Sequence, residues 1–362
     1  MNTQELITAL QSQGLRLAEQ GTGAPGRRGG AGPSDHRAVT IAGTTVMVPI
    51  YTGTAAGSPY SARLAPEPGQ ATLYQGDRAI APIAFPQVPR FYGLETADGI
   101  PYWKIALLHS RDVLATTVLQ TCRRYRDEAT RCQFCAIEQS LEADLTIARK
   151  TPTQLAEVAA AAVRLDGVQQ MVMTSGTPPT RDRGAAYLAE CARAVKQRVA
   201  LPIQVQCEPP EDFAWFERLR DAGVDSLGMH LEAITPAVRA QIMPGKAEVP
   251  VEFYFQAFEA AVPVFGWGQV STYLLAGLGD SLEALVAGCD RLIQLGVYPF
   301  VVPFVPITGT PLQDHPAPSS DFMVTLYQRV GALLHQAGMH SAQIKAGCAK
   351  CGACSALSTF EG

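Results

Sequence analysis

Charge and long apolar runs are both scarce in this sequence. Charged residues make up 17% of the 362 residues, and the formal net charge is −4. We therefore expect no basic surface for nucleic acid or for an anionic membrane. No stretch approaches the roughly 18 consecutive apolar residues of a membrane span, and the polar, amphipathic helix expected over residues 1–20 lacks the apolar core of a signal peptide. These absences favour a cytoplasmic protein without nucleic-acid or membrane partners.

The sequence also lacks the cysteine framework of a disulfide-rich protein. Its nine cysteines are an odd number, and most fall into two compact groups, which in a reducing compartment favours metal ligation. The groups are Cys122, Cys132 and Cys135, and then Cys348, Cys351 and Cys354. The single cysteines are Cys191, Cys207 and Cys289, and isolated cysteines are usually small buried hydrophobic residues.

Apolar residues are abundant, at 47%, and their pattern divides the chain into three parts. Residues 1–112 are expected to form a helix and a β-rich region, which includes a strand over 101–109. Residues 316–362 are expected to form a helix and a cysteine-rich tail. Between them, over residues 113–315, strands alternate with helices. The expected strands are 113–121, 168–176, 201–208, 224–233, 268–279 and 297–311. Such apolar strands predict an α/β fold, a partial (β/α)6 TIM-type barrel with its chemistry at the C-terminal strand ends.

The first cysteine group follows the first expected barrel strand. In Cys122-x9-Cys132-x2-Cys135, three thiolates suit three irons of a [4Fe–4S] cluster and leave the fourth iron open to an external ligand. The Cys-x2-Cys pair alone also suits zinc. The position at a strand end of a repeated βα pattern favours the cluster.

These residues resemble the motif of the radical S-adenosylmethionine (SAM) superfamily, CxxxCxΦC with Φ aromatic. Cys132-Gln133-Phe134-Cys135 matches its second half, whereas the first gap is nine residues instead of three. The resemblance covers residues 113–312 and is to a biotin synthase-like core. It implies an enzyme that cleaves SAM reductively to a 5′-deoxyadenosyl radical, acts on a small-molecule metabolite and takes its electron from a donor such as flavodoxin or ferredoxin.

A narrower resemblance is to bacterial radical SAM proteins of unknown substrate encoded beside a nitrilase homologue. The wide cysteine gap, the segments GMHLEA and GQVSTYLLAGLGD, and the tail GCAKCGACSALSTFEG carry it. It indicates neither the substrate nor the reaction outcome.

The superfamily resemblance also implies a set of SAM contacts at the strand ends. They are Phe134, Ser175, Gly176, Thr177, Glu208, His230, Glu232, Arg239, Gly277, Gly279 and Pro303. Among them, Ser175–Thr177 takes the place of the usual Gly-Gly-Glu, His230 and Glu232 lie where the ribose binds, and Arg239 is placed to pair with the SAM carboxylate. Each also has a plain structural explanation, such as a turn glycine, a core histidine or a helix-capping acid.

The second cysteine group, Cys348-x2-Cys351-x2-Cys354, resembles the first three ligands of a bacterial ferredoxin without the fourth. An auxiliary iron–sulfur cluster is the favoured interpretation, and a zinc site or redox-active thiols are the alternatives. We also predict that Cys207 belongs to no barrel-centred [2Fe–2S] cluster.

Other assignments stay open at this stage. Arg27 and Arg28 lie among glycines, where they suit either an anionic substrate group or a solvated linker. No catalytic acid or base can be assigned; Tyr298, Glu208 and the 123–131 loop are candidates because we expect them at the barrel mouth. The rival function is a metal-binding or electron-transfer protein that does not cleave SAM, and the acidic charge balance disfavours an RNA-modifying enzyme.

Overall fold

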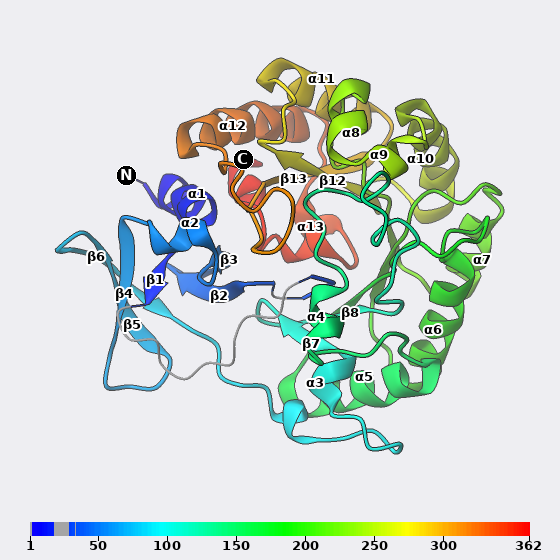
Figure 1. Ribbon diagram of the computed structural model, residues 1–362, viewed down its shortest axis with the longest axis horizontal. Coiled ribbons are helices and arrows are strands. Elements are labelled where there is room, and N and C mark those ends of the chain that lie inside the picture. The colour runs from blue at the N-terminus through cyan, green and yellow to red at the C-terminus, as the bar shows by residue number, and fades with distance from the viewer. Residues whose placement is uncertain (1, 18–28, 33) are drawn as a thin grey trace.

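The computed structural model describes residues 2–17, 29–32 and 34–362, so the prediction for Arg27 and Arg28 lies outside the described residues. A seven-stranded sheet occupies its centre (Figure 1). The strands are β7 (Leu107–His109), β8 (Val113–Thr117), β9 (Gln170–Thr174), β10 (Ile203–Gln206), β11 (Ser226–Gly228), β12 (Val270–Ala276) and β13 (Val297–Pro303). They lie in the order β13-β12-β11-β10-β9-β8-β7, with β8 to β13 parallel. Among the described residues β13 and β7 do not pair, so the predicted partial (β/α)6 barrel is confirmed.

Helices cover the outer face of this half-barrel (Figure 1). They are α5 (Pro152–Asp166), α6 (Ala185–Arg198), α7 (Trp215–Asp221), α8 (Pro236–Ile242), α9 (Pro244–Ala247), α10 (Val251–Phe265), α11 (Leu282–Gln294) and α12 (Ser320–Gln336). In α5 the bounds follow from local chemistry. Thr151 forms a capping box with Gln154, and Gly167 ends the helix with a left-handed φ of 66°.

A second, six-stranded sheet precedes the half-barrel, in the order β1-β4-β5-β6-β2-β3. Its strands are β1 (Arg16–Leu17), β2 (His36–Ile41), β3 (Thr44–Pro49), β4 (Tyr60–Leu64), β5 (Gln70–Gln75) and β6 (Arg78–Ala84). The short elements around it are α2 (Gly53–Ala56) and the 3₁₀ helix η1 (Arg90–Gly93). The first helix, α1, spans Thr3–Gln13 and ends at Gly14, whose φ is 75°, so the helix expected over 1–20 is too long.

The strand expected over residues 101–109 is also wrong in its first half. The helix α3 (Tyr102–Ile105) precedes β7, which is only Leu107–His109. Tyr102 and Ile105 are both buried and lie three positions apart. A helical turn places both on the same face, toward the core, which a strand would not.

The residues after α12 return to the inside of the half-barrel (Figure 1). This tail contains η2 (Ser341–Gln343), α13 (Cys348–Cys351) and η3 (Leu357–Phe360). The Lys345 N–H donates to Gln269, which directly precedes β12, and the Gly347 N–H donates to Gln170, the first residue of β9. The tail therefore enters at the N-terminal ends of the parallel strands, opposite the edge where the first cysteine group lies. No helix of the described residues is long and apolar enough to cross a membrane.

Candidate active site

The first cysteine group lies in the loop between β8 and the short helix α4 (Gln139–Glu142), at the C-terminal edge of the sheet. Glu138 ties the ends of this loop together, because its carboxylate accepts hydrogen bonds from the Cys122 N–H at 3.4 Å and from Arg126 Nε at 2.8 Å. The Cys135 N–H donates to the Cys132 carbonyl at 3.0 Å. The three cysteines are half-buried.

The three thiols lie close enough to influence one another. Burial raises the pKa of the Cys135 thiol to about 12, and negative charge on the neighbouring Cys122 raises it further. Burial likewise raises the pKa of Cys132, with Cys135 and Cys122 adding to the shift. In the described part of the chain, no three His, Cys, Asp or Glu side chains are arranged to hold a single metal ion. Thiolates of a cubane cluster bind separate irons and need not converge on one point.

Behind these cysteines lies a buried layer of charged side chains. Arg124 pairs with Glu208, and the Thr177 hydroxyl donates to the same carboxylate at 2.8 Å. Lys246 pairs with Glu232 at 3.0 Å. Charge neutralisation is thus local, as buried ions require. The second oxygen of Glu208, Oε2, is buried without a hydrogen-bond partner among the described residues, which fits a bound cationic group.

These neighbours control ionisation in the layer. Burial raises the pKa of the Glu208 carboxyl, but Lys246 and Arg124 outweigh burial and hold that pKa below its ordinary value. Burial disfavours the charged form of Lys246, and the facing Glu232 carboxylate reverses this and raises the Lys246 pKa. Glu208 and Lys246 are therefore ionised at neutral pH. Glu232 also has a φ of 67°, an uncommon backbone conformation for a side chain of its size.

His230 follows β11 and presents a free donor to the cavity described below. Its Nδ1 accepts the Tyr273 N–H at 3.2 Å, so the proton of the neutral ring is on Nε2. Nε2 is buried and has no partner among the described residues. Burial, with Lys246 adding to it, lowers the pKa of His230 to about 3. The ring is therefore neutral and can donate one hydrogen bond to a bound molecule.

The loop after β9 must approach the cysteine loop closely. A Cβ atom on Gly176 would lie 2.1 Å from the Thr121 carbonyl oxygen, so only glycine fits there. The Arg123 N–H donates to the Thr177 carbonyl at 2.9 Å. Ser175, Gly176 and Thr177 thus line up beside the residue that precedes Cys122.

The remaining predicted contacts lie farther along the same edge. Phe134 packs against the cluster of Ile242, Leu278 and Phe304. Gly277 and Gly279 have φ values of 106° and 124° in the turn after β12. Pro303 ends β13 and lines a small cavity of about 170 Å³.

Arg239 and Tyr298 occupy positions that differ from those expected. The Arg239 side chain is 1% exposed, donates to the carbonyls of Leu231, Lys246 and Val249, and lies over the Tyr254 ring. Its donors hold the fold together, which does not favour a SAM contact. Tyr298 was expected at the barrel mouth, and this is wrong. It lies near the start of β13, where its hydroxyl donates to Glu361.

The second cysteine group lies inside the half-barrel. Gln206 Nε2 donates to Cys348 Sγ at 3.1 Å, and His109 Nε2 lies 3.3 Å from Cys354 Sγ. Tyr273 hydrogen-bonds to Cys348, and negative charge on all three tail cysteines raises its pKa beyond the effect of burial. Burial raises the pKa of Cys351 to about 12. The Tyr273 hydroxyl therefore lies beside Cys348 and Cys354.

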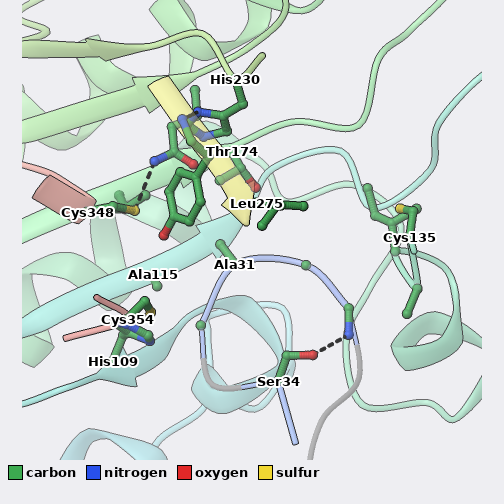
Figure 2. Close-up of a pocket in the computed structure, with 18 of the residues that line it drawn as sticks. Ala31, Ser34, His109, Ala115, Cys135, Thr174, His230, Leu275, Cys348 and Cys354 are labelled. Atoms are coloured by element: carbon green, nitrogen blue, oxygen red, sulfur yellow. Dashed lines mark hydrogen bonds between the residues drawn. The ribbon is translucent and has the colours of Figure 1, made fainter. Parts of the chain in front are cut away.

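One cavity of about 400 Å³ is lined by Cys135 of the first group and by Cys348, Cys351 and Cys354 of the second. Figure 2 shows Cys135 on one side and Cys348 and Cys354 on the other, with His230 above the space between them. The cavity lining is largely apolar, and its polar members include Gln206, Glu232 and Tyr273. A small molecule that fills the cavity would lie between Cys135 and the second cysteine group.

The single cysteines are buried in the core, as predicted for small hydrophobic residues. Cys191 and Cys289 lie on α6 and α11 and are fully buried. Cys207 packs in the main hydrophobic core. The alternation of strand side chains places it opposite Gln206, whose amide reaches the tail from the inner face. This placement favours the prediction that Cys207 is no ligand of a barrel-centred cluster.

Several site residues were not predicted from the sequence: Lys246, Tyr273, His109, Gln204 and Gln206. A signal existed for Gln204 and Gln206, because polar residues at alternate positions of a central strand mark one inward face. No local signal points to Lys246, which acquires its role only by folding against Glu232.

A sequence model of the radical SAM superfamily matches residues 125–292. Part of the chain thus resembles the radical SAM superfamily. The matched segment includes Cys132 and Cys135 and begins just after Cys122. The match to this superfamily implies a [4Fe–4S] cluster and SAM as cofactors and confirms the prediction of an enzyme. The narrower resemblance to the nitrilase-associated family stays a prediction.

The chain is also similar to a curated protein, bacteriochlorophyllide c C-7(1)-hydroxylase of Chlorobaculum limnaeum. The two are 30% identical over 164 residues, which cover 43% of this chain and 40% of the relative. Among solved structures, methylornithine synthase is 18% identical with a TM-score of 0.48, covering 64% of this chain and 65% of that one. A radical SAM methyltransferase from Sphaerobacter thermophilus is 16% identical with a TM-score of 0.47, covering 73% and 75%. The chain thus spans less than half of its curated relative.

Proposed function

We propose that this radical SAM protein binds a [4Fe–4S] cluster through Cys122, Cys132 and Cys135 and cleaves SAM reductively, to act on a small-molecule metabolite. The observation that carries the proposal is the cavity of about 400 Å³ with Cys135 in its wall, inside a radical SAM half-barrel. When bound, the cluster and SAM supply a 5′-deoxyadenosyl radical that can abstract hydrogen. The protein binds and orients the cofactors and the substrate, and it shields the radical from competing reactions.

Two buried atoms that have no hydrogen-bond partner among the described residues support a SAM site beside these cysteines. Glu208 Oε2 is free to accept from the SAM ammonium group, and His230 Nε2–H is free to donate. Phe134 offers an aromatic face at the cavity wall. Glu232 is held by Lys246 and remains in the lining. The other proposed contacts are Ser175, Gly176, Thr177, Gly277, Gly279 and Pro303.

The cavity favours a small and largely neutral substrate. Its volume is near the lower end of the range for small-molecule sites, about 300–1,000 Å³. The lining offers hydrogen-bond partners such as Gln206 and Thr174 within an apolar surface. No catalytic acid or base is assigned. The half-barrel, proposed as residues 113–315, receives its electron from a flavodoxin- or ferredoxin-like donor, and a cytoplasmic location is part of the proposal.

We propose an auxiliary iron–sulfur cluster for the tail cysteines, with zinc as the alternative. Cys348, Cys351 and Cys354 lie across the cavity from Cys135 (Figure 2). A metal centre there would contact the same bound molecule. This placement supports a role of the tail cysteines in the reaction and disfavours a metal centre that is unrelated to the reaction.

The test is anaerobic reconstitution followed by measurement of iron, sulfide, zinc and 5′-deoxyadenosine. We expect about eight irons per chain, an electron paramagnetic resonance signal that SAM perturbs, and 5′-deoxyadenosine formation. The triple variant Cys122→Ala, Cys132→Ala, Cys135→Ala should lose about four irons and all SAM cleavage. Cys191→Ala, in the helix α6, is the matched control and should lose neither. Bound iron without any 5′-deoxyadenosine would instead favour the rival electron-transfer function.

A further inference from the structure

His109 lies beside the tail cysteines, across the cavity from Cys135 (Figure 2). It is the last residue of β7 and pairs with Val113 of β8. Its Nε2 atom is 3.3 Å from Cys354 Sγ. The proposed SAM site does not use this side chain, so its position needs a separate explanation.

The turn between β7 and β8 makes a second contact with the tail. Ser110, the next residue, hydrogen-bonds to the Cys351 thiol through its hydroxyl. Its φ is 58°, an uncommon conformation for serine. Two consecutive residues of one turn therefore contact two of the three tail thiols.

The tail itself is held firmly in place for such contacts. The Cys348 N–H donates to Gln204 Oε1 at 3.2 Å, and a Cβ atom on Gly347 would lie 2.2 Å from the same side chain. On the other side, the Ala353 carbonyl accepts from the Met47 N–H at 2.7 Å and from Gln11 Nε2 at 2.9 Å. The thiols are thus positioned by two sheets and by α1, as a preformed site requires.

Three thiolates leave one position of a tetrahedral zinc ion, or one iron of a cubane cluster, without a protein ligand. Other polar side chains that contact the tail thiols include an amide, a phenol and a hydroxyl, from Gln206, Tyr273 and Ser110. The Asp112 carboxylate acts on the pKa of Cys351 through its charge and not through a hydrogen bond. Imidazole is the better ligand, because it binds both zinc and the irons of Fe–S clusters. His109 Nε2, which lies 3.3 Å from Cys354 Sγ, is the ring nitrogen placed to bind such a metal, and Nδ1 has no hydrogen-bond partner among the described residues.

We propose that His109 is the fourth protein ligand of a metal centre formed with Cys348, Cys351 and Cys354. This inference rests on the proposed function only because it requires that the tail binds a metal. Both an iron–sulfur cluster and a zinc ion can be held by three thiolates and one imidazole. Four protein ligands leave no open position for a molecule in the cavity. The tail centre then differs from the first cluster, whose three cysteines leave one iron open.

The experiment uses the full chain with Cys122, Cys132 and Cys135 changed to alanine, so that the tail is the remaining cysteine cluster. Protein labelled with ¹⁵N-histidine is reconstituted anaerobically with iron and sulfide, or with zinc. His109→Ala and His109→Cys are compared with His36→Gln, which alters a nearby histidine whose Nδ1 contacts the Ser34 carbonyl. The readouts are metal content, pulsed electron paramagnetic resonance of the reduced cluster, and X-ray absorption at the zinc edge.

We expect a ¹⁵N coupling on the cluster, or three sulfur and one nitrogen ligands on zinc, in the parent and in His36→Gln. Both His109 variants should lose the nitrogen signal. His109→Cys should keep the metal, and His109→Ala should bind it at least about tenfold more weakly. A zinc result supports the His109 assignment and refutes the auxiliary cluster.

Metal that binds without a histidine signal, or a signal that survives in His109→Cys, overturns the assignment. A tail that binds no metal overturns both the assignment and the auxiliary centre. SAM cleavage by the unaltered protein is measured separately as 5′-deoxyadenosine, so failure of the main proposed function remains distinguishable.

Discussion

The buried pair of Arg124 and Glu208 offers the sharpest test of the site's energetics. In Glu208→Gln the side chain keeps its volume, and both Arg124 and Thr177 can still donate to the new amide oxygen. What is lost is the negative charge opposite a guanidinium that is 7% exposed. Removing one partner of a buried pair leaves an uncompensated charge and costs about 3 kcal/mol. We therefore expect the free energy of unfolding to fall by about that amount.

An exposed pair provides the matched control for this change. Arg291 forms two hydrogen bonds, of 2.7 and 2.6 Å, with Glu252, and both side chains are about half exposed. Solvent screens such a pair, so Glu252→Gln should cost only about 0.5 kcal/mol. Urea unfolding of both variants in the absence of SAM, at pH 7, measures the two losses. Equal losses would refute the argument that burial decides the energy of the Arg124 pair.

The same variant predicts a pH dependence. The pKa of Glu208 in the folded state is below its ordinary value of 4.5, so its charge stabilises the fold at pH values above 4.5. That stabilisation is lost as the pH falls through the folded-state pKa, because the carboxyl is then protonated in both states. The difference in stability between the unaltered protein and Glu208→Gln should thus shrink below about pH 4. A difference that stays constant from pH 7 to pH 3 would contradict the assignment.

Three further changes test other parts of the site. Gly176→Ala should lower the iron content, and it should lower the free energy of unfolding by about 1–3 kcal/mol, because the added Cβ would clash with the Thr121 carbonyl. Gly53→Ala is the control and should change neither quantity, since a Cβ at Gly53 would meet nothing within 4 Å. His230→Phe should weaken SAM binding about five- to tenfold by removing one hydrogen bond without reducing bound iron; unchanged SAM affinity in equilibrium binding would reject the Nε2 contact. Changing the three tail cysteines to serine should remove about four irons yet leave 5′-deoxyadenosine formation intact, and loss of that product as well would show that the two centres are not independent.

Local patterns predicted the half-barrel well. Each of its parallel strands falls inside a segment expected to be a strand, because buried parallel strands are apolar runs that a single sequence reveals. The N-cap of α5 at Thr151 could also be predicted from the sequence, because a capping box depends only on neighbouring residues. Errors arose where a short segment can satisfy burial in two ways, as at Tyr102 and Ile105.

The candidate site was less accessible from sequence, because its contacts join distant segments. The Gly347 N–H donates a hydrogen bond to Gln170, which is far away in the sequence, and no local sequence pattern near either residue predicts this contact. Arg239 was a reasonable choice for an anion ligand by position alone. Its burial among backbone carbonyls depends on where α9 and the Lys246 and Val249 carbonyls lie, which local patterns do not contain.

The entry of the tail at the N-terminal strand ends has a consequence for biosynthesis. Cys348, Cys351 and Cys354 line the cavity, yet the ribosome makes them after every strand of the half-barrel. The earlier residues can collapse around Cys122, Cys132 and Cys135 while the opposite wall is still missing. Cluster insertion at the first site can therefore precede completion of the cavity. In a nascent chain stalled before Gly347, the proposed iron site would be open to solvent on the side that the tail later covers. The order of synthesis thus gives the maturation machinery a period of access that the finished fold removes.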